Sequence, residues 1–279
     1  MTEPKTREEK YLNAIANGEN INLNPITREE MFLAKAGGQD IKVPTPITRK
    51  EIFLSKISGG GSPIEPSAEN KFVKLVDGSL TEITEKDLEG ATSIRAYAFC
   101  QSAVIERVAL PNTITSIGEH AFYNCSKLTA ITIPDNVTEI PMNAFAQTGI
   151  TSITIPNGVT VLQKQAFYGC SALTSVKLPN SLDSIGDNAF SSCVSLTSLT
   201  IPASVTNIND RALSIGSYAD FYNGKGTITF LGTIPPTISS KTFHQSYLEK
   251  IIVPKGCGEA YKTATNWANF ADYIEEAAE

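Results

Sequence analysis

A repeat of 23 residues constrains this chain more than any other feature of its sequence. The dipeptide Ala-Phe recurs at this spacing, with one interval of 22 residues, and a proline recurs in step with it. The dipeptides lie at 98–99, 121–122, 144–145, 166–167 and 189–190, with Ala212-Leu213 as a diverged copy, and the prolines are Pro111, Pro134, Pro156, Pro179 and Pro202. Sequence repeats of roughly 20–50 residues are typical of solenoids, in which each unit buries its apolar face against its neighbours.

The segment before each proline is predicted to be a strand. Apolar and polar residues alternate in "LTAITIP" (128–134) and "LTSLTIP" (196–202), and a period of two indicates a strand with one buried face. A second apolar pair follows each proline, at Ile114/Ile117, Val137/Ile140, Val159/Leu162, Leu182/Ile185 and Val205/Ile208. The sequence therefore predicts an α/β repeat solenoid over residues 70–279, with one parallel sheet.

The period and the residue pattern of these units resemble the BspA-type leucine-rich repeat family, as in "LTAITIPDNVTEIPMNAFAQ" and "ALTSVKLPNSLDSIGDNAFSSC". The ending "IIVPKGCGEAYKTATNWANFADYIEEA" is similar to the terminal segment of that family, which implies a C-terminal cap. A hairpin around Asp77-Gly78, within Phe72–Thr84, is the expected N-terminal cap. The resemblance implies binding and adhesion by secreted surface proteins, although "MTEPKTREEKYLNAIANG" does not read as a secretory signal peptide.

Residues 1–58 carry a second repeat, of 21 residues. Three copies of Thr-x-x-Glu, at Thr6/Glu9, Thr27/Glu30 and Thr48/Glu51, each precede an apolar pair. This pattern is a capping box and predicts three short helices, near 7–16, 28–36 and 49–57. Isolated helices shorter than ~12–15 residues are marginally stable in water, so these helices either form a small bundle or dock on a partner. A Gly/Ser/Pro linker at 59–69 follows this arm.

We interpret the arm as an anchoring and oligomerisation segment. Its candidate anchoring residues are Tyr11, Leu12, Ile15, Phe32, Leu33, Phe53, Leu54 and Ile57. The phrase P-I-T-R-x-E-x-F-L, present at 25–33 and 46–54, resembles N-terminal segments of virion proteins of bacteriophages that infect gut bacteria. That resemblance implies docking to virion proteins, assembly in the host cytoplasm and a place on the virion surface. Tandem weak contacts add avidity, so we also expect a homo-oligomer.

The sequence offers little for catalysis. Cys125, Cys170 and Cys193 share one repeat position, three residues after the repeated Phe, and are expected to be buried thiols. His120 and His244 fall in different turns, and Cys-x-x-Cys is absent, so we predict no catalytic site, no metal site and no cofactor.

Charge and hydropathy exclude two further classes of partner. The arm holds nine Lys/Arg and eight Asp/Glu, and the remainder holds fourteen against twenty-one, so neither part is basic enough to bind nucleic acid. The sequence contains no run of 18 apolar residues, so we expect no membrane insertion. We interpret Glu139, Asp183 and Asp187 as part of a solvated surface.

Two regions are candidates for ligand binding. The exposed positions of the strands carry Thr132, Thr154, Lys177 and Thr200, which form a polar row or simply suit strands. Ser214–Gly226 interrupts the repeat and holds Tyr218, Phe221 and Tyr222, which bind a partner or pack back on the coil.

The resulting hypothesis is a non-enzymatic bacteriophage virion structural and adhesion protein of the head-fibre, decoration or tail-fibre type. Its solenoid binds a host-surface or mucosal glycan or protein. A bacterial cell-surface adhesin of the same repeat family and an intracellular interaction scaffold are the alternatives.

Overall fold

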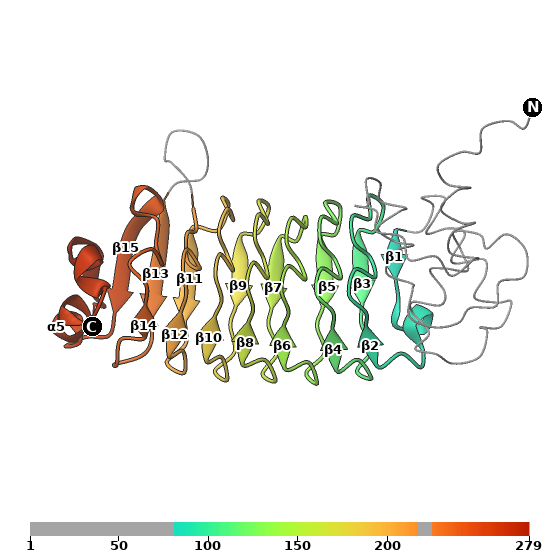
Figure 1. Cartoon of the computed structure of the whole chain (residues 1–279), viewed down its shortest axis with the longest axis horizontal. Coiled ribbons are helices and arrows are strands. Elements are labelled where there is room, and N and C mark those ends of the chain that lie inside the picture. The colour runs from blue at the N-terminus through green and yellow to red at the C-terminus, as the bar shows by residue number, and fades with distance from the viewer. Residues whose placement is uncertain (1–80, 217–224, 279) are drawn as a thin grey trace, which may run out of the picture. The chain divides into compact units, whose positions relative to one another are not determined.

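The computed structural model describes residues 81–216 and 225–278, which belong to one unit of the chain (Figure 1). These residues form a coil of stacked turns in which the chain repeatedly crosses two rows of short strands. The predicted three-helix arm and the 59–69 linker lie outside the described residues. Most of the predicted N-terminal hairpin also lies outside them.

The first row contains the strands that precede the repeated prolines, and further strands extend it at both ends. Its members, in spatial order, are β1 (Glu82–Ile83), β3 (Arg107–Ala109), β5 (Ala130–Thr132), β7 (Ser152–Thr154), β9 (Ser175–Lys177), β11 (Ser198–Ile201), β13 (Gly226–Phe230), β15 (Leu248–Val253) and β16 (Ile274–Glu276). The strand pairs within this row are parallel. The register pairs equivalent repeat positions, such as Val108 with Ile131, so each residue type meets its own copy in the next turn.

A second row of parallel strands corrects the prediction of a single sheet. It consists of β2 (Ser93–Ile94), β4 (Ser116–Ile117), β6 (Glu139–Ile140), β8 (Val161–Leu162), β10 (Ser184–Ile185), β12 (Asn207–Ile208) and β14 (Thr237–Ile238). From β4 to β12, each strand contains the second residue of the apolar pair that follows the proline. Ile185 pairs in register with Ile208, so the stacking of the turns also aligns the backbone N–H and C=O groups at this position, and the two segments pair as parallel strands.

Turns, and not helices, carry the repeated Ala-Phe segments, so the α part of the predicted class is small. The residue before each Ala has a positive φ, of 56° at His120 and 55° at Asn143. Alternate backbone N–H groups bond to the next turn, as Phe122 does to the Ala144 carbonyl at 2.8 Å, and those between them bond within the turn, as Ala121 does to the Gly118 carbonyl at 3.2 Å, so no continuous helical ladder forms. Helices in the described part are α5 (Gly258–Thr263) and the 3-10 segments η2 (Glu85–Leu88), η3 (Gln245–Tyr247) and η4 (Trp267–Tyr273).

The core between the two rows is a column of phenylalanine rings. Phe99, Phe122, Phe145, Phe167 and Phe190 stack with ring centroids 5.1–5.5 Å apart and interplanar angles of 3–12°. The second apolar pairs are also buried, as the sequence predicts. Val176 on β9 and Leu178 just after it are only half-buried, unlike the equivalent residues of the neighbouring turns.

The predicted buried thiols are confirmed. Cys125, Cys170 and Cys193 are fully buried free cysteines, and each thiol donates a hydrogen bond to the carbonyl of a Phe in the preceding turn. Burial raises the pKa of the Cys193 thiol, so this group stays protonated and able to donate. Thr148 takes the same position in the 22-residue unit, and its hydroxyl donates to the Phe145 carbonyl at 2.9 Å.

The segment after β13 closes the coil. Trp267, Tyr261 and Phe270 are buried there, and their rings cross one another or Phe230 and Phe243 at steep angles. No helix within residues 81–216 and 225–278 is long and apolar enough to cross a membrane.

Candidate functional site

The outward face of the first row carries the predicted polar residues. Thr132, Thr154, Lys177 and Thr200 are all exposed, each on its own strand. Thr154 pairs in register with Lys177, and Thr200 pairs with Thr229 of β13. Strand spacing of ~4.8 Å therefore repeats a polar side chain along this face. The structure places these residues together, and their role in binding stays a prediction.

The predicted aromatic site lies largely outside the described residues, because Tyr218, Phe221 and Tyr222 fall in 217–224. The described ends of this segment lie side by side, since Gly216 and Lys225 form an antiparallel bridge. Gly226 follows directly and approaches Ile215 so closely that an added Cβ would lie 2.6 Å from its side chain. The base of the insertion is thus closed by the body of the coil.

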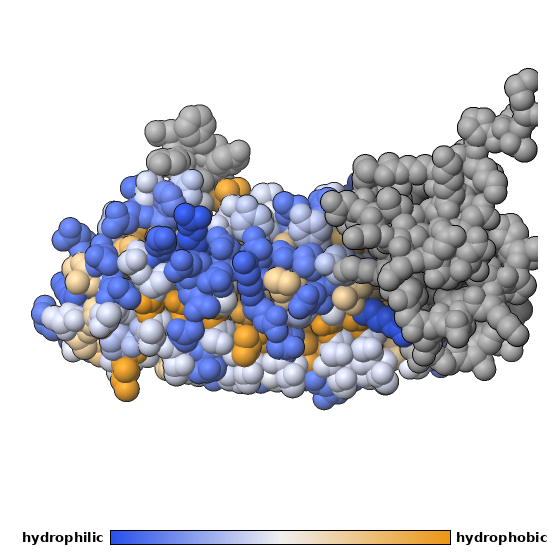
Figure 2. Space-filling model, in the orientation of Figure 1, coloured by the Kyte–Doolittle hydropathy of each residue, from blue (hydrophilic) through white to orange (hydrophobic). Residues whose placement is uncertain are grey.

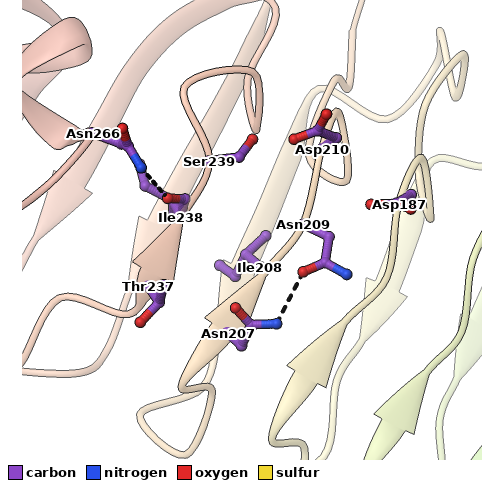
Figure 3. Close-up of a pocket in the computed structure, with 9 residues that line it drawn as sticks. All are labelled: Asp187, Asn207, Ile208, Asn209, Asp210, Thr237, Ile238, Ser239 and Asn266. Carbon is purple, nitrogen blue, oxygen red and sulfur yellow. Dashed lines mark hydrogen bonds between the residues drawn. The ribbon is translucent and has the colours of Figure 1, made fainter.

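A polar hollow lies where β10, β12 and β14 end and the closing segment begins (Figure 3). Its volume is about 340 Å³, and it is lined by Asp187, Asn207, Ile208, Asn209, Asp210, Thr237, Ile238, Ser239 and Asn266. Equivalent positions of parallel strands end at the same edge of the sheet, which brings polar side chains from three successive turns together. Asn266 is added from the N-terminal end of η4.

Internal hydrogen bonds hold several of these side chains in place. The Asn207 amide donates to Asn209 Oδ1 at 2.9 Å, and the Asn266 amide donates to the Ile238 carbonyl at 2.7 Å (Figure 3). The backbone N–H of Lys241 donates to Ser239 Oγ at 3.0 Å. These bonds fix the oxygen of Ser239 and the amide planes of Asn207 and Asn266 before any ligand arrives.

The charge of the hollow is negative. Asp187 and Asp210 occupy the same repeat position in successive turns, and no Lys or Arg is among the lining residues. Asp187 was expected on a solvated surface, but it is half-buried at the edge of this hollow. Asp183 and Glu139 are exposed as expected, and they accept hydrogen bonds from Thr206 and Gln163.

The histidines do not join a nucleophile. His120 stacks on Tyr97 with centroids 4.6 Å apart, and its Nε2 lies 3.1 Å from the Asn143 amide nitrogen. His244 stacks on Tyr247 at 4.3 Å, in a distant turn. Within the described ranges, no group of three or more His, Cys, Asp or Glu residues is placed to hold a metal ion. These placements give both rings a packing role at the turns.

Sequence reasoning missed the asparagines of the hollow. Asn209 stands where Gly118 and Gly186 stand in other units, and this departure from the repeat was the available signal. Asn266 carried no comparable signal, because the closing segment has no second copy in the chain against which to compare it.

Comparisons with known proteins match the repeats. A family model, the BspA-type leucine-rich repeat region, matches six copies over residues 92–219. A search of curated proteins found no significant match. The virion resemblance of the arm stays a prediction.

Similar solved structures are leucine-rich repeat proteins. A Treponema pallidum leucine-rich repeat protein is 31% identical over 51% of this chain and 68% of its own, with a TM-score of 0.44. A Bacteroides ovatus leucine-rich repeat protein is 26% identical over 58% of this chain and 59% of its own, with a TM-score of 0.35. The pneumococcal vaccine antigen PcpA is 15% identical over 72% of this chain and 66% of its own, with a TM-score of 0.42. The family match and the T. pallidum relative show that the chain belongs to the BspA-type leucine-rich repeat family.

Proposed function

We propose that this protein is a non-enzymatic structural and adhesion component of a bacteriophage virion. In this proposal residues 1–58 dock to virion proteins, the 59–69 linker supplies reach, and the solenoid is displayed on the virion surface. The solenoid binds a host-surface or mucosal glycan or protein. The observation that carries the binding role is the regular exposed face of the first row.

The arrangement of side chains on the exposed face of the first row suits binding more than catalysis. Four successive turns each add an exposed polar side chain at the same position, namely Thr132, Thr154, Lys177 and Thr200. Hydrophilic residues also cover much of the face drawn in the space-filling view (Figure 2). A surface of equivalent groups favours many similar contacts with an extended partner, whereas catalysis requires different groups that converge on one atom.

The repeated arm supports the virion setting. Its three capping boxes, spaced by 21 residues, suit a partner that also repeats or is symmetric. Several weak helical contacts on one particle give firm attachment through effective concentration, without any strong single contact. The resemblance of P-I-T-R-x-E-x-F-L to virion segments points to the same partner.

A bacterial cell-surface adhesin is the second candidate. Membership of the BspA-type family favours it, because that resemblance implies surface adhesion. The solenoid would play the same binding role in this setting, and the arm would associate with other copies or with the envelope.

Location separates the two candidates. An antibody raised against the solenoid is used to probe density-purified phage particles, cell envelope and cytosol from the source culture. We expect the protein to band with the particles. Protein found in the envelope alone would replace the virion role by the adhesin, and protein confined to the cytosol would contradict both.

A further inference from the structure

The polar hollow has a specific chemical character. We infer that it is a binding site for a neutral carbohydrate, with room for the terminal units of a glycan. This site is separate from the exposed face of the first row. The inference rests on the proposed binding role of the solenoid and does not depend on the virion setting.

The hollow offers both acceptors and donors. Once the internal hydrogen bonds are made, Asn207 Oδ1 and Asn266 Oδ1 still accept, and Asn209 Nδ2 still donates. Ser239 Oγ already accepts from a backbone N–H, so its proton can be donated to a ligand. Sugar hydroxyl groups donate and accept at the same atom, and they therefore match a mixed lining of this kind.

The charge selects a neutral sugar over an acidic one. Asp187 and Asp210 repel carboxylated or sulfated sugars, and no lining Lys or Arg offsets them. A cationic peptide side chain would use the two carboxylates. It has no acceptor, however, and would leave the Asn209 amide and the Ser239 hydroxyl without partners. The mixed lining thus favours a polyol.

The size and the open rim of the hollow also suit a sugar. A volume of about 340 Å³ is at the low end of ligand pockets, which span roughly 300–1,000 Å³. Ile208 and Ile238 belong to the buried core, at 1% and 3% exposure, whereas exposed Asp210 and Thr237 stand at the rim of the hollow (Figure 3). A longer glycan chain can therefore leave the hollow toward solvent.

The test uses the full chain on an array of neutral oligosaccharides together with their sialylated counterparts. We expect binding to at least one neutral glycan, and at least tenfold weaker binding once a sialic acid is added to that glycan. Thr237→Trp places an indole at the rim of the hollow and should weaken binding at least tenfold. Ser116→Trp is the matched control, because Ser116 is also exposed at the first position of a second-row strand but lies on β4, several turns away from the hollow, and it should leave binding unchanged.

A double variant, D187N/D210N, decides between a sugar and a cation. Amides keep the shape and most hydrogen bonds of the carboxylates, so sugar binding should fall less than tenfold. A parallel array of Lys- and Arg-containing peptides shows whether the wild-type chain binds cations, and peptide binding that the double variant abolishes would overturn the inference. Circular dichroism checks that each variant is folded.

Three further outcomes would overturn the inference. They are the absence of neutral-glycan binding by the wild-type chain, equal binding by Thr237→Trp and wild type, and equal losses of binding in Thr237→Trp and Ser116→Trp. A further variant, Thr200→Trp, tests the first row: loss of binding there but not in Thr237→Trp would place the ligand on the first row and would leave the proposed adhesion role standing. Failure of the virion setting is seen separately, in the location experiment.

Discussion

The central repeats and the closing segment bury aromatic rings in different ways. In the repeats, five phenylalanines stack nearly parallel, with interplanar angles of 3–12°. In the closing segment, the rings of Phe230, Phe243, Tyr261, Trp267 and Phe270 meet at angles of 54–84°. The first arrangement extends to further turns, whereas the second ends the stack.

The difference follows from what each region must pack against. A repeat turn always meets a copy of itself, so one residue type in one orientation fills the core. The last turn has no copy beyond it and must cover the exposed end with larger and amphipathic rings. Trp267 Nε1 donates to the Pro236 carbonyl at 2.9 Å, and the Tyr261 hydroxyl donates to the Gly232 carbonyl at 2.7 Å. These bonds pair backbone carbonyls that the closing segment buries.

The largest effect is expected from removing the central ring of the closing segment. Trp267 is 1% exposed and contacts Phe230, Phe243 and Tyr261. Trp267→Ala should lower the free energy of unfolding by about 3–5 kcal/mol through the cavity it leaves. Urea unfolding measures the loss. Trp267→Phe is the control that keeps most of the ring, and equal stability of Trp267→Ala and wild type would contradict the sealing role.

A smaller effect is expected from crowding two repeat turns. A Cβ added at Gly118 would lie 2.1 Å from the backbone nitrogen of Ala96, so the turns must separate locally. Gly118→Ala should cost about 1–3 kcal/mol in thermal or urea unfolding. Glu119→Ala, at the exposed next position, should change stability by less than about 0.5 kcal/mol. If the two variants behave alike, close stacking is not what holds the turns together.

The pH dependence of the closing segment provides a finer comparison. Hydrogen bonds from the backbone N–H groups of Gly256 and Gly258, at 2.9 and 2.8 Å, lower the pKa of the Glu276 carboxyl. The folded pKa lies below the unfolded one, so this stabilisation is present above the unfolded pKa and is lost as the pH falls through the folded pKa. When the pH is lowered from 6 to 3, the melting temperature of Glu276→Gln should therefore fall by less than that of the wild type. Identical slopes would show that this carboxylate does not stabilise the closing segment.

The smallest effect is expected at the repeat position that holds a cysteine in some units and a threonine in another. Thr148 replaces the cysteine of the neighbouring units, and its hydroxyl also donates to a phenylalanine carbonyl, that of Phe145 in its own turn, whereas the thiols bond to the preceding turn. Cys193→Thr should consequently change the free energy of unfolding by about 1 kcal/mol or less. Cys193→Ala removes the donor and should destabilise more. A threonine variant less stable than the alanine variant would indicate that the two positions differ in shape.

Stacking explains which parts of the fold could be predicted. The positions of Phe122 and Phe145, and the burial of Ile140, follow from a period that superposes each residue on its copy. The second row was not predicted, because strands of two residues, such as Ser184–Ile185, are too short to show an alternating pattern. The left-handed backbone at Asn143, which shapes an Ala-Phe turn, was not predicted, because it leaves no clear trace in the sequence.

The candidate sites divide in the same way. The exposed row through Thr132 and Thr154 could be predicted, since it repeats with the strands. The hollow could not be predicted, because it depends on Asn266 from the closing segment meeting the ends of β10, β12 and β14. Repeated positions can be inferred from the period, whereas contacts between a repeat and its unique neighbour require the structure.

The central claim is that the arm and the solenoid have separate roles, attachment and binding. The most direct test compares the full chain with a chain lacking residues 1–58, both produced in the source host. The account predicts that the shorter chain keeps a single melting transition at an unchanged midpoint but no longer bands with purified particles. A shorter chain that still bands with particles, or that loses cooperative melting, would contradict the claim.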